Sequence, residues 1–249
     1  MKKYYKNEFN IFTINKMIKV GCCGFPVAHS RYYKVLEVIE VQSTFYDFVN
    51  PENLRKWREK APGNFEFVLK AFQFITHPAT SPTYKRARHL ENLKLENLGN
   101  FQPTREVLKC YEILKDYATI LKTKIVIFQS PPGFKPEKEN IKNMKNFFNK
   151  IDRKDFIFGW ESRGRWQPEE IEKICKELGL IHVVDPFLRA PTYGKIFYYR
   201  LHGGRGYKHQ FMDEELEKLA EMVKNKTGYV MFNNITMFDD AQRFLKFLK

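Results

Sequence analysis

Eight short runs rich in β-branched and aromatic residues recur along this chain of 249 residues, and amphipathic stretches separate most of them. Runs of this composition are typical of buried β-strands. We expect strands at Ile18–Cys22, Leu36–Val41, Phe65–Leu69, Ile125–Phe128, Phe156–Trp160, Leu180–Val184, Ile196–Leu201 and Tyr229–Phe232. Strands that alternate with helices form parallel sheets, and eight such units can close on themselves. The sequence therefore predicts an α/β fold, a single (β/α)8 TIM barrel.

Helix-start and helix-stop residues lie between the expected strands. Asn50 stands before a proline, while Thr104 and Asp213 precede apolar residues at helical spacing, as N-cap residues do. Pro168 opens another helix, which Gly179 ends. The last helix is expected from one apolar stripe, formed by Ala241, Phe244, Leu245 and Leu248.

The eight units differ in length. The first two strands begin about 18 residues apart, which leaves room for a short helix only. The sixth and seventh strands begin about 16 residues apart, so Asp185–Lys195 is expected to form a loop or a single turn without a full helix. The third and fourth strands are about 60 residues apart, which predicts an insertion over roughly His77–Gln102. We expect residues 1–17 to be an N-terminal extension and residues 18–249 to form the single barrel domain.

The charge of the chain favours anionic partners. There are 43 Lys and Arg residues against 29 Asp and Glu residues, a formal net charge of +14. Such an excess raises encounter rates with nucleic acids or phosphorylated small molecules, although a solvated lysine-rich surface has the same composition. We find neither an apolar run long enough to span a membrane nor a secretory signal. The cysteines, four in number and without a CxxC pair, suit a reducing cytoplasm, so a cytoplasmic protein with no membrane partner is expected.

Polar residues stand at or just after the carboxyl ends of the expected strands, where the active face of a TIM barrel lies. Glu161 is a candidate general acid or base, and His202 titrates near neutrality and could carry its proton. Lys70 could stabilise developing negative charge or, alternatively, form a Schiff base. With Glu40 after the second strand, the candidate catalytic residues are Glu40, Lys70, Glu161 and His202.

A basic, glycine-rich segment follows the seventh strand directly. Its glycines allow backbone N–H groups to approach a ligand closely and to form an anion-binding nest. The loops after strands seven and eight are frequent phosphate sites in TIM barrels. Together with the other polar strand ends, this segment predicts the ligand-binding residues Arg163, Arg200, Gly203, Gly204, Arg205, Tyr207, Tyr46, His77, Gln129, Asp185, Asn233 and Asn234.

Two other interpretations of these residues remain open. Glu40 could pair with Lys70, and Glu161 with Arg163 or Arg200, as internal braces without a chemical role. A divalent metal could also be held by a set of carboxylates and imidazoles drawn from Glu40, Glu161, Asp185, His202 and His77. Since no HExxH or paired-histidine spacing occurs, a metal is not favoured, and the sequence predicts no specific cofactor.

Seven blocks in order resemble one known family. The first two blocks are Gly21-Cys-Cys-Gly24-Phe25 and the segment from Glu40 to Tyr46. The third runs from Phe65-Glu-Phe67 through Lys70 to His77. The other four are Gln129-Ser-Pro131-Pro132, Glu161-Ser-Arg163, Arg200-Leu-His202-Gly203 and Phe232-Asn233-Asn234. From about residue 18 the chain is similar to the YecE-like family, also called domain of unknown function 72. The resemblance implies a TIM barrel with these blocks at its mouth, and it implies no activity.

Three functions are therefore compatible with the sequence. The first is a hydrolase- or lyase-like enzyme acting on a phosphorylated or nucleic-acid-derived substrate. The second is a nucleic-acid-binding module without catalysis, and the third is a metabolite sensor. The partner is expected to be an anionic small molecule or a nucleic acid in each case, and the sequence indicates no oligomeric state.

Overall fold

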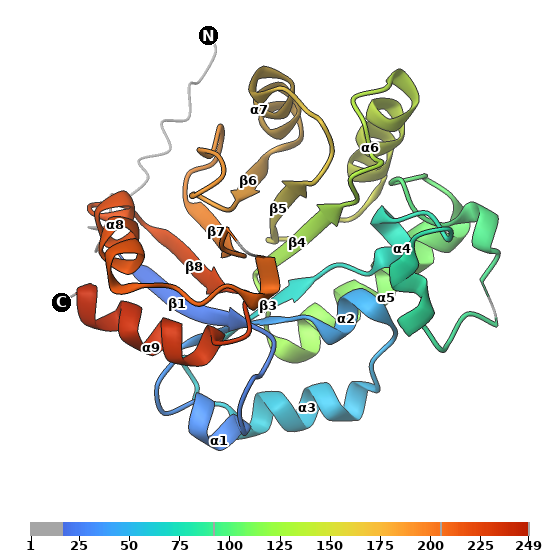
Figure 1. The fold of residues 1–249 in the computed structure, drawn as a ribbon. Helices are drawn as coiled ribbons and strands as arrows, with labels where there is room; N and C mark the ends of the chain where they lie inside the picture. The colour runs from blue at the N-terminus through green and yellow to red at the C-terminus, as the bar shows by residue number, and fades with distance from the viewer. Residues whose placement is uncertain (1–16, 92, 205, 249) are drawn as a thin grey trace, which may run out of the picture.

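The structure is a computed structural model that describes residues 17–91, 93–204 and 206–248. In these residues eight parallel strands form one closed barrel in chain order, and β8 pairs with β1 (Figure 1). The strands are β1 (Ile18–Cys23), β2 (Val38–Val41), β3 (Glu66–Lys70), β4 (Ile125–Ser130), β5 (Ile157–Ser162), β6 (Leu180–Val184), β7 (Phe197–Leu201) and β8 (Gly228–Phe232). The expected (β/α)8 TIM barrel is confirmed. Residues 1–16 of the expected N-terminal extension lie outside the described residues.

The helices that follow the strands form the outer layer. The α-helices are α1 (His29–Tyr32), α2 (Ser43–Tyr46), α3 (Pro51–Lys60), α4 (Gln73–Thr76), α5 (Arg105–Leu121), α6 (Lys138–Lys150), α7 (Pro168–Leu178), α8 (Asp213–Val223) and α9 (Met237–Phe247). Short 3-10 helices occur at Pro82–Arg86, Leu95–Asn97 and Gly206–Lys208. In the described part of the chain, no helix is both long and apolar enough to cross a membrane.

Local capping explains where several helices begin and end. The Asn50 side chain accepts a hydrogen bond from the Glu52 N–H, and Thr104 Oγ1 accepts one from the Val107 N–H, as expected for N-caps. Gly179 ends α7 in the left-handed conformation. The expectation for α8 was wrong by one residue, because Asp213 is its first residue and Met212 is the N-cap.

Two apolar cores hold the barrel together. Alternate strand residues form an inner core, which fills the barrel with side chains such as Val38, Ile127, Val183 and Tyr198. The remaining strand residues pack outward against the helices in a larger core. Gly159 on β5 faces the interior because a Cβ at this position would lie 2.7 Å from Ile127 and from Val183. The inner core closes the barrel below its carboxyl-terminal mouth, so side chains beyond it can line a cavity.

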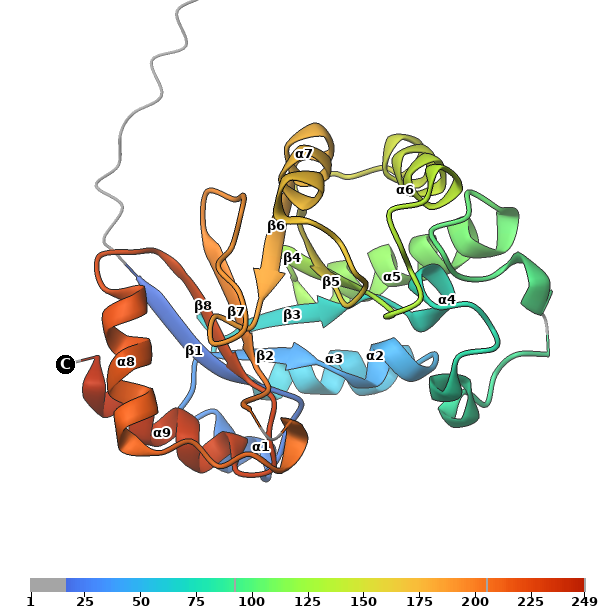
Figure 2. The same cartoon turned by 45° about the horizontal axis from the view of Figure 1, so that its top comes forward.

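The irregular units lie where the strand spacing predicted them. After β1 the helix α1 has only four residues, and in the described residues no helix joins β6 to β7. The long segment between β3 and α5 lies at the side of the barrel toward which β3 points (Figure 2).

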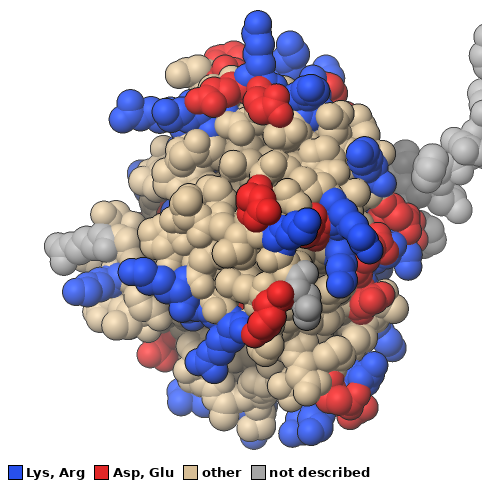
Figure 3. Space-filling model, turned by 90° about the vertical axis from the view of Figure 1, so that its right-hand side faces the viewer, with Lys and Arg blue, Asp and Glu red and all other residues tan. Residues whose placement is uncertain are grey.

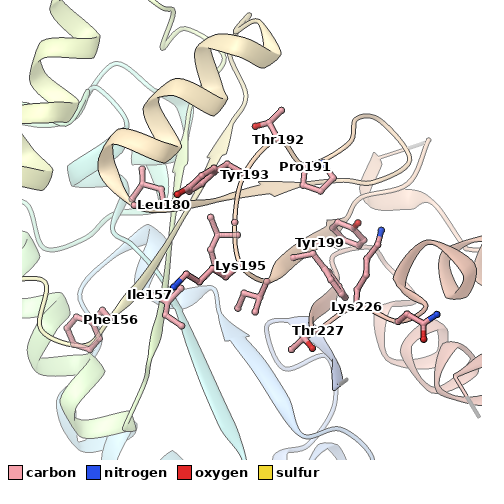
Figure 4. Close-up of a pocket in the computed structure, with 16 residues that line it drawn as sticks. Phe156, Ile157, Leu180, Pro191, Thr192, Tyr193, Lys195, Tyr199, Lys226 and Thr227 are labelled. Atoms are coloured by element: carbon pink, nitrogen blue, oxygen red, sulfur yellow. The ribbon is translucent and has the colours of Figure 1, made fainter. Parts of the chain in front are cut away.

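Outward side chains of β6 and β7, among them Leu180 and Tyr199, line a largely apolar groove of about 940 Å³ at the amino-terminal ends of the strands (Figure 4).

Candidate functional site

A cavity of about 640 Å³ lies at the carboxyl ends of the strands. Its walls come from segments far apart in the sequence, because the ends of all eight parallel strands meet at the same face of the barrel. The lining residues are Cys23, Gln42, Tyr46, Lys70, His77, Arg86, Gln129, Pro131, Pro132, Arg163, His202, Tyr207, Asn233 and Met237. Eight of them belong to the predicted site set, so the structure brings much of that set together around one cavity.

Arg200 forms the base of the site between two carboxylates. Its side chain is fully buried, and Nη1 donates to Glu161 Oε2 while Nε donates to Glu40 Oε2 at 3.1 Å. Its Nη2 lies 3.0 Å from Glu40 Oε1. Glu40 also accepts hydrogen bonds from Tyr198, at 2.8 Å, and from the Gln42 amide. A buried guanidinium with two carboxylate partners satisfies charges that would be costly to bury alone.

Glu161 joins this base to the residues that line the cavity. Its Oε1 accepts a hydrogen bond from Arg163 Nε at 2.7 Å and lies 3.5 Å from His202 Nε2. Arg163 Nη2 also contacts His202 Nε2, and Asn233 Nδ2 lies 3.1 Å from Nδ1 of the same ring. Both nitrogens of the His202 imidazole are therefore fixed, and the guanidinium of Arg163 is held at the cavity wall.

Lys70 at the end of β3 has a different environment from the other basic groups. Its Nζ donates to Gln129 Oε1 at 2.9 Å and lies 3.7 Å from the centre of the Phe45 ring. Gln129 in turn donates from Nε2 to Glu161 Oε2 at 3.0 Å. The amide of Gln129 thus separates the ammonium group of Lys70 from the nearest hydrogen-bonded carboxylate.

Burial and neighbouring charges shift several pKa values in this site. Burial, followed by the charge of Arg200, lowers the pKa of Lys70 to about 7. Burial would raise the pKa of Glu161, but the guanidinium groups of Arg200 and Arg163 outweigh it and hold that pKa well below its usual value. Burial lowers the pKa of His202, and it lowers the pKa of His77 to about 3. At neutral pH, Glu161 is therefore ionised and both imidazoles are neutral.

The segment after β7 is fixed from below by Asp185, which follows β6. Asp185 Oδ2 accepts hydrogen bonds from the backbone N–H groups of His202 at 2.8 Å and Gly203 at 3.3 Å. Gly203 has a φ of +71°, and a Cβ there would lie 2.2 Å from the His209 ring. Gly204 is exposed, with no atom within 4 Å of a Cβ position. Arg205 lies outside the described residues.

Some predicted site residues support the cavity without lining it. Glu40, Glu161 and Arg200 lie beneath it, and Asp185 holds the loop after β7. Asn234 is fully buried and donates to His209 O at 2.7 Å and to Asp240 Oδ2 at 2.6 Å. Of the two expected braces, the one from Glu161 to Arg163 and Arg200 occurs, whereas Glu40 pairs with Arg200 where Lys70 was expected.

Six of the lining residues, four of them in the sequence blocks that resemble the family, were not predicted as site residues. Arg86 is the most informative of them, because its guanidinium lies 3.5 Å from the centre of the Tyr46 ring. The sequence signal for Arg86 is a group of basic residues within the insertion, Lys85, Arg86, Arg88 and His89, and nothing in the sequence placed that group at the barrel mouth. The others are Cys23, Gln42, Pro131, Pro132 and Met237.

The site offers little to a metal ion. Across residues 17–91, 93–204 and 206–248, no group of three or more His, Cys, Asp or Glu side chains is arranged to hold one. Glu40 and Glu161 direct their carboxylates at Arg200, and Asp185 accepts backbone hydrogen bonds. These oxygen atoms are engaged by donors that a cation would have to displace.

Comparison with known proteins agrees with the fold. The family described as "Protein of unknown function DUF72" matches residues 29–249. DUF72 family proteins of known structure from Enterococcus faecalis V583 and Thermotoga maritima MSB8 superpose with TM-scores of 0.70 and 0.65, at 18% and 19% identity. The superpositions cover 93% of this chain in both cases, and 95% and 99% of the other chains.

One curated relative is UPF0759 protein YunF of Bacillus subtilis (strain 168), which is 24% identical over 156 residues. That match covers 61% of this chain and half of the length of the relative. A D-tagatose 3-epimerase-like protein shares the barrel fold at a TM-score of 0.54 and 13% identity, covering 92% of this chain and 98% of that one. With the family match extending over most of the chain, this protein belongs to the DUF72 family.

Proposed function

We propose that the cavity at the mouth of the barrel binds an anionic ligand, phosphorylated or derived from nucleic acid, and supports hydrolase- or lyase-like acid–base chemistry on it. One observation carries the proposal. Among the described residues that line the cavity, three are basic, Lys70, Arg86 and Arg163, and none is acidic. The acidic residues at the strand ends, Glu40 and Glu161, lie beneath the cavity, where Arg200 binds both carboxylates. A concave site with one sign of charge concentrates ligands of the opposite sign.

The acid–base part of the proposal rests on His202. Its neutral imidazole lines the cavity, and its Nε2 faces both Glu161 and the guanidinium of Arg163. For His202 to accept a proton from a ligand, one ring nitrogen exchanges its protein partner for the ligand, and the ionised carboxylate 3.5 Å from Nε2 stabilises the imidazolium that results. Glu161 then acts through His202, while Lys70 and Arg163 contact the anion.

A small anion fits the charge distribution better than a nucleic-acid duplex. A duplex binder needs basic residues gathered along one face, where they neutralise several phosphates. On the face shown in Figure 3, which carries the insertion after β3, Lys and Arg side chains surround a broad uncharged area and alternate with Asp and Glu. The described residues on that face form no continuous basic stripe (Figure 3), whereas Lys70, Arg86 and Arg163 converge on the cavity.

Binding is tested first with inorganic phosphate and with a short single-stranded oligonucleotide, by titration calorimetry at two salt concentrations. We expect Arg163→Gln to weaken phosphate binding at least tenfold. Arg165→Gln is the matched control, because this arginine is exposed two residues away and does not line the cavity; its effect should stay below twofold. Equal weakening by both variants, or no phosphate binding at all, contradicts the proposal.

Chemistry is tested separately by hydrolysis of phosphate monoesters and diesters. Glu161→Gln should abolish turnover while phosphate binding persists. Binding without turnover of any ester by the wild-type protein would favour a metabolite sensor. Preferential binding of the oligonucleotide, with a steep loss at higher salt and weakening by substitution of Lys85 and Arg88, would favour a nucleic-acid-binding module.

A further inference from the structure

We propose that Lys70 is a nucleophile that forms an imine with a small carbonyl compound carrying a carboxylate or phosphate group. This inference rests on the proposed binding of anions in the same cavity, and it names the substrate class. It starts from the placement of one amine. Lys70 is at the carboxyl end of β3, two residues beyond Val68 of the inner core, so its side chain points along the barrel interior toward the mouth. The residue is 4% exposed and lines the cavity.

The partners of Lys70 leave its amine available. Within the described residues no carboxylate oxygen lies within 4.0 Å of Nζ, although Glu40 and Glu161 are close enough to affect its charge. Arg200 occupies both carboxylates, and the only hydrogen bond described for Nζ goes to the neutral amide oxygen of Gln129. A structural lysine buried in a barrel would be expected to pair with one of these acids, as Lys19 does with Glu66 at the other end.

The local electrostatics favour the free amine. With a pKa of about 7, Lys70 carries a nucleophilic neutral amine at neutral pH far more often than an ordinary lysine, which is almost fully protonated. Burial and the neighbouring Arg200 are the physical causes of this shift. The side chain that bears the amine is also held in place, between the Phe45 ring and the Gln129 amide.

The covalent step needs only groups that line the cavity and water. The Nζ lone pair attacks the carbonyl carbon, the π electrons move to the oxygen, and a proton passes from nitrogen to oxygen to give a carbinolamine. Loss of water then gives the imine, so one amine and one carbonyl yield one imine and one water. The neutral imidazole of His202 can carry the proton, and the guanidinium groups of Arg163 and Arg86 can hold the anionic end.

Reductive trapping tests the inference on the full chain. The protein is incubated at pH 7 with dihydroxyacetone phosphate, glyoxylate or uncharged dihydroxyacetone, and sodium cyanoborohydride reduces any imine to a stable amine. Intact mass and peptide mapping then locate the adduct. We expect one adduct per chain at Lys70, formed at least tenfold faster than at any other lysine, and faster with the anionic probes than with dihydroxyacetone.

Two variants sharpen the test. Lys70→Arg keeps a positive charge and should abolish the specific adduct, whereas Lys85→Arg removes an exposed lysine next to Arg86 and should leave it unchanged. Labelling spread evenly over the lysines of the wild-type protein overturns the inference, whether or not Lys70→Arg folds. Phosphate binding without labelling of Lys70 would leave the proposed anion site standing and refute the imine. If charged and uncharged probes label Lys70 equally, and inorganic phosphate added as a competitor does not slow the labelling, the imine is supported and anion binding is refuted.

Discussion

Replacing Arg200 by methionine tests whether the buried ion network stabilises the barrel mouth. The substitution removes the guanidinium that binds Glu40, which is fully buried, and Glu161, which is 5% exposed. Removing one partner from a buried ion pair costs about 3–5 kcal/mol, because the remaining charge stays buried without compensation. Tyr198 and Gln42 still donate to Glu40, and Arg163 still pairs with Glu161. We therefore expect a loss in the lower half of that range.

Urea unfolding followed by circular dichroism measures this loss as a change in the unfolding midpoint. In a thermal melt it corresponds to a decrease of roughly 6–16 °C for a chain of this length. Arg55→Met is the control, because Arg55 pairs with Glu52 on the surface of α3, where such pairs contribute about 0–1 kcal/mol. If Arg200→Met destabilises the protein no more than Arg55→Met does, the network does not stabilise the mouth.

The dependence of this effect on pH provides a second check. The folded-state pKa of Glu161 lies below its unfolded value, so the stability that it contributes is fully present above the unfolded pKa of about 4.3 and is lost as the pH falls through the folded pKa. Without Arg200, the largest influence that lowers this pKa is gone and burial raises it. The protonated carboxyl is then less costly to bury, so the difference between wild type and Arg200→Met should be smaller at pH 5 than at pH 7.

Three further predictions concern the loop after β7 and the cysteines. Gly203→Ala should destabilise the protein by about 1–3 kcal/mol, because its φ of +71° disfavours a side chain and the Cβ would meet the His209 ring, whereas Gly204→Ala should cost less than about 0.5 kcal/mol in the same urea assay. Asp185→Asn should speed amide hydrogen exchange of His202 and Gly203 about tenfold or more, since hydrogen bonds to a charged acceptor contribute about 1.5–3 kcal/mol; unchanged exchange would show that Asp185 does not hold the loop. All four thiols are buried, and burial raises their pKa values, including that of Cys23 at the cavity, so a thiol reagent at pH 8 should label them slowly in the folded protein and all four rapidly after unfolding; rapid labelling of the native chain would contradict this.

The fold was predictable because its main signals are local. Strand composition, helix caps and the spacing between strands are properties of neighbouring residues, and the structure confirms them. The predicted carboxyl-terminal boundaries of β4 and β5 were wrong, because polar residues continue both strands. Gln129 and Ser130 extend β4, and Glu161 and Ser162 extend β5, because the two strands stay paired through these residues; Gln129 also donates to Glu161, and Trp160 donates to Ser130. A sequence pattern that ends strands at the first polar residue misses such positions.

Part of the cavity lining was predictable from the sequence, but the pairing of its charged groups was not. The rule that parallel strands end at one face was enough to place Lys70, Gln129, Arg163 and His202 at one cavity. It suggested that Glu40 pairs with Lys70 on the adjacent strand. In the structure Glu40 pairs with Arg200, which is 160 positions away in the sequence, because a long side chain on β7 reaches across the barrel to β2. Contacts across the barrel depend on strand tilt and side-chain length, which the sequence does not display.

The polar residues at the strand ends can have both a structural and a functional role, because different side chains carry the two roles. Glu40 and Glu161 neutralise Arg200 and Arg163, so this network carries no net charge and does not need a ligand to be stable. The Lys70 amine and the Arg86 guanidinium lie outside that balance and line the cavity. An anion can therefore gain attraction from these two groups without displacing a carboxylate from its partner. Because the carboxylates stay with Arg200, the amine of Lys70 has no carboxylate partner among the described residues, and this is the feature on which the proposed imine depends.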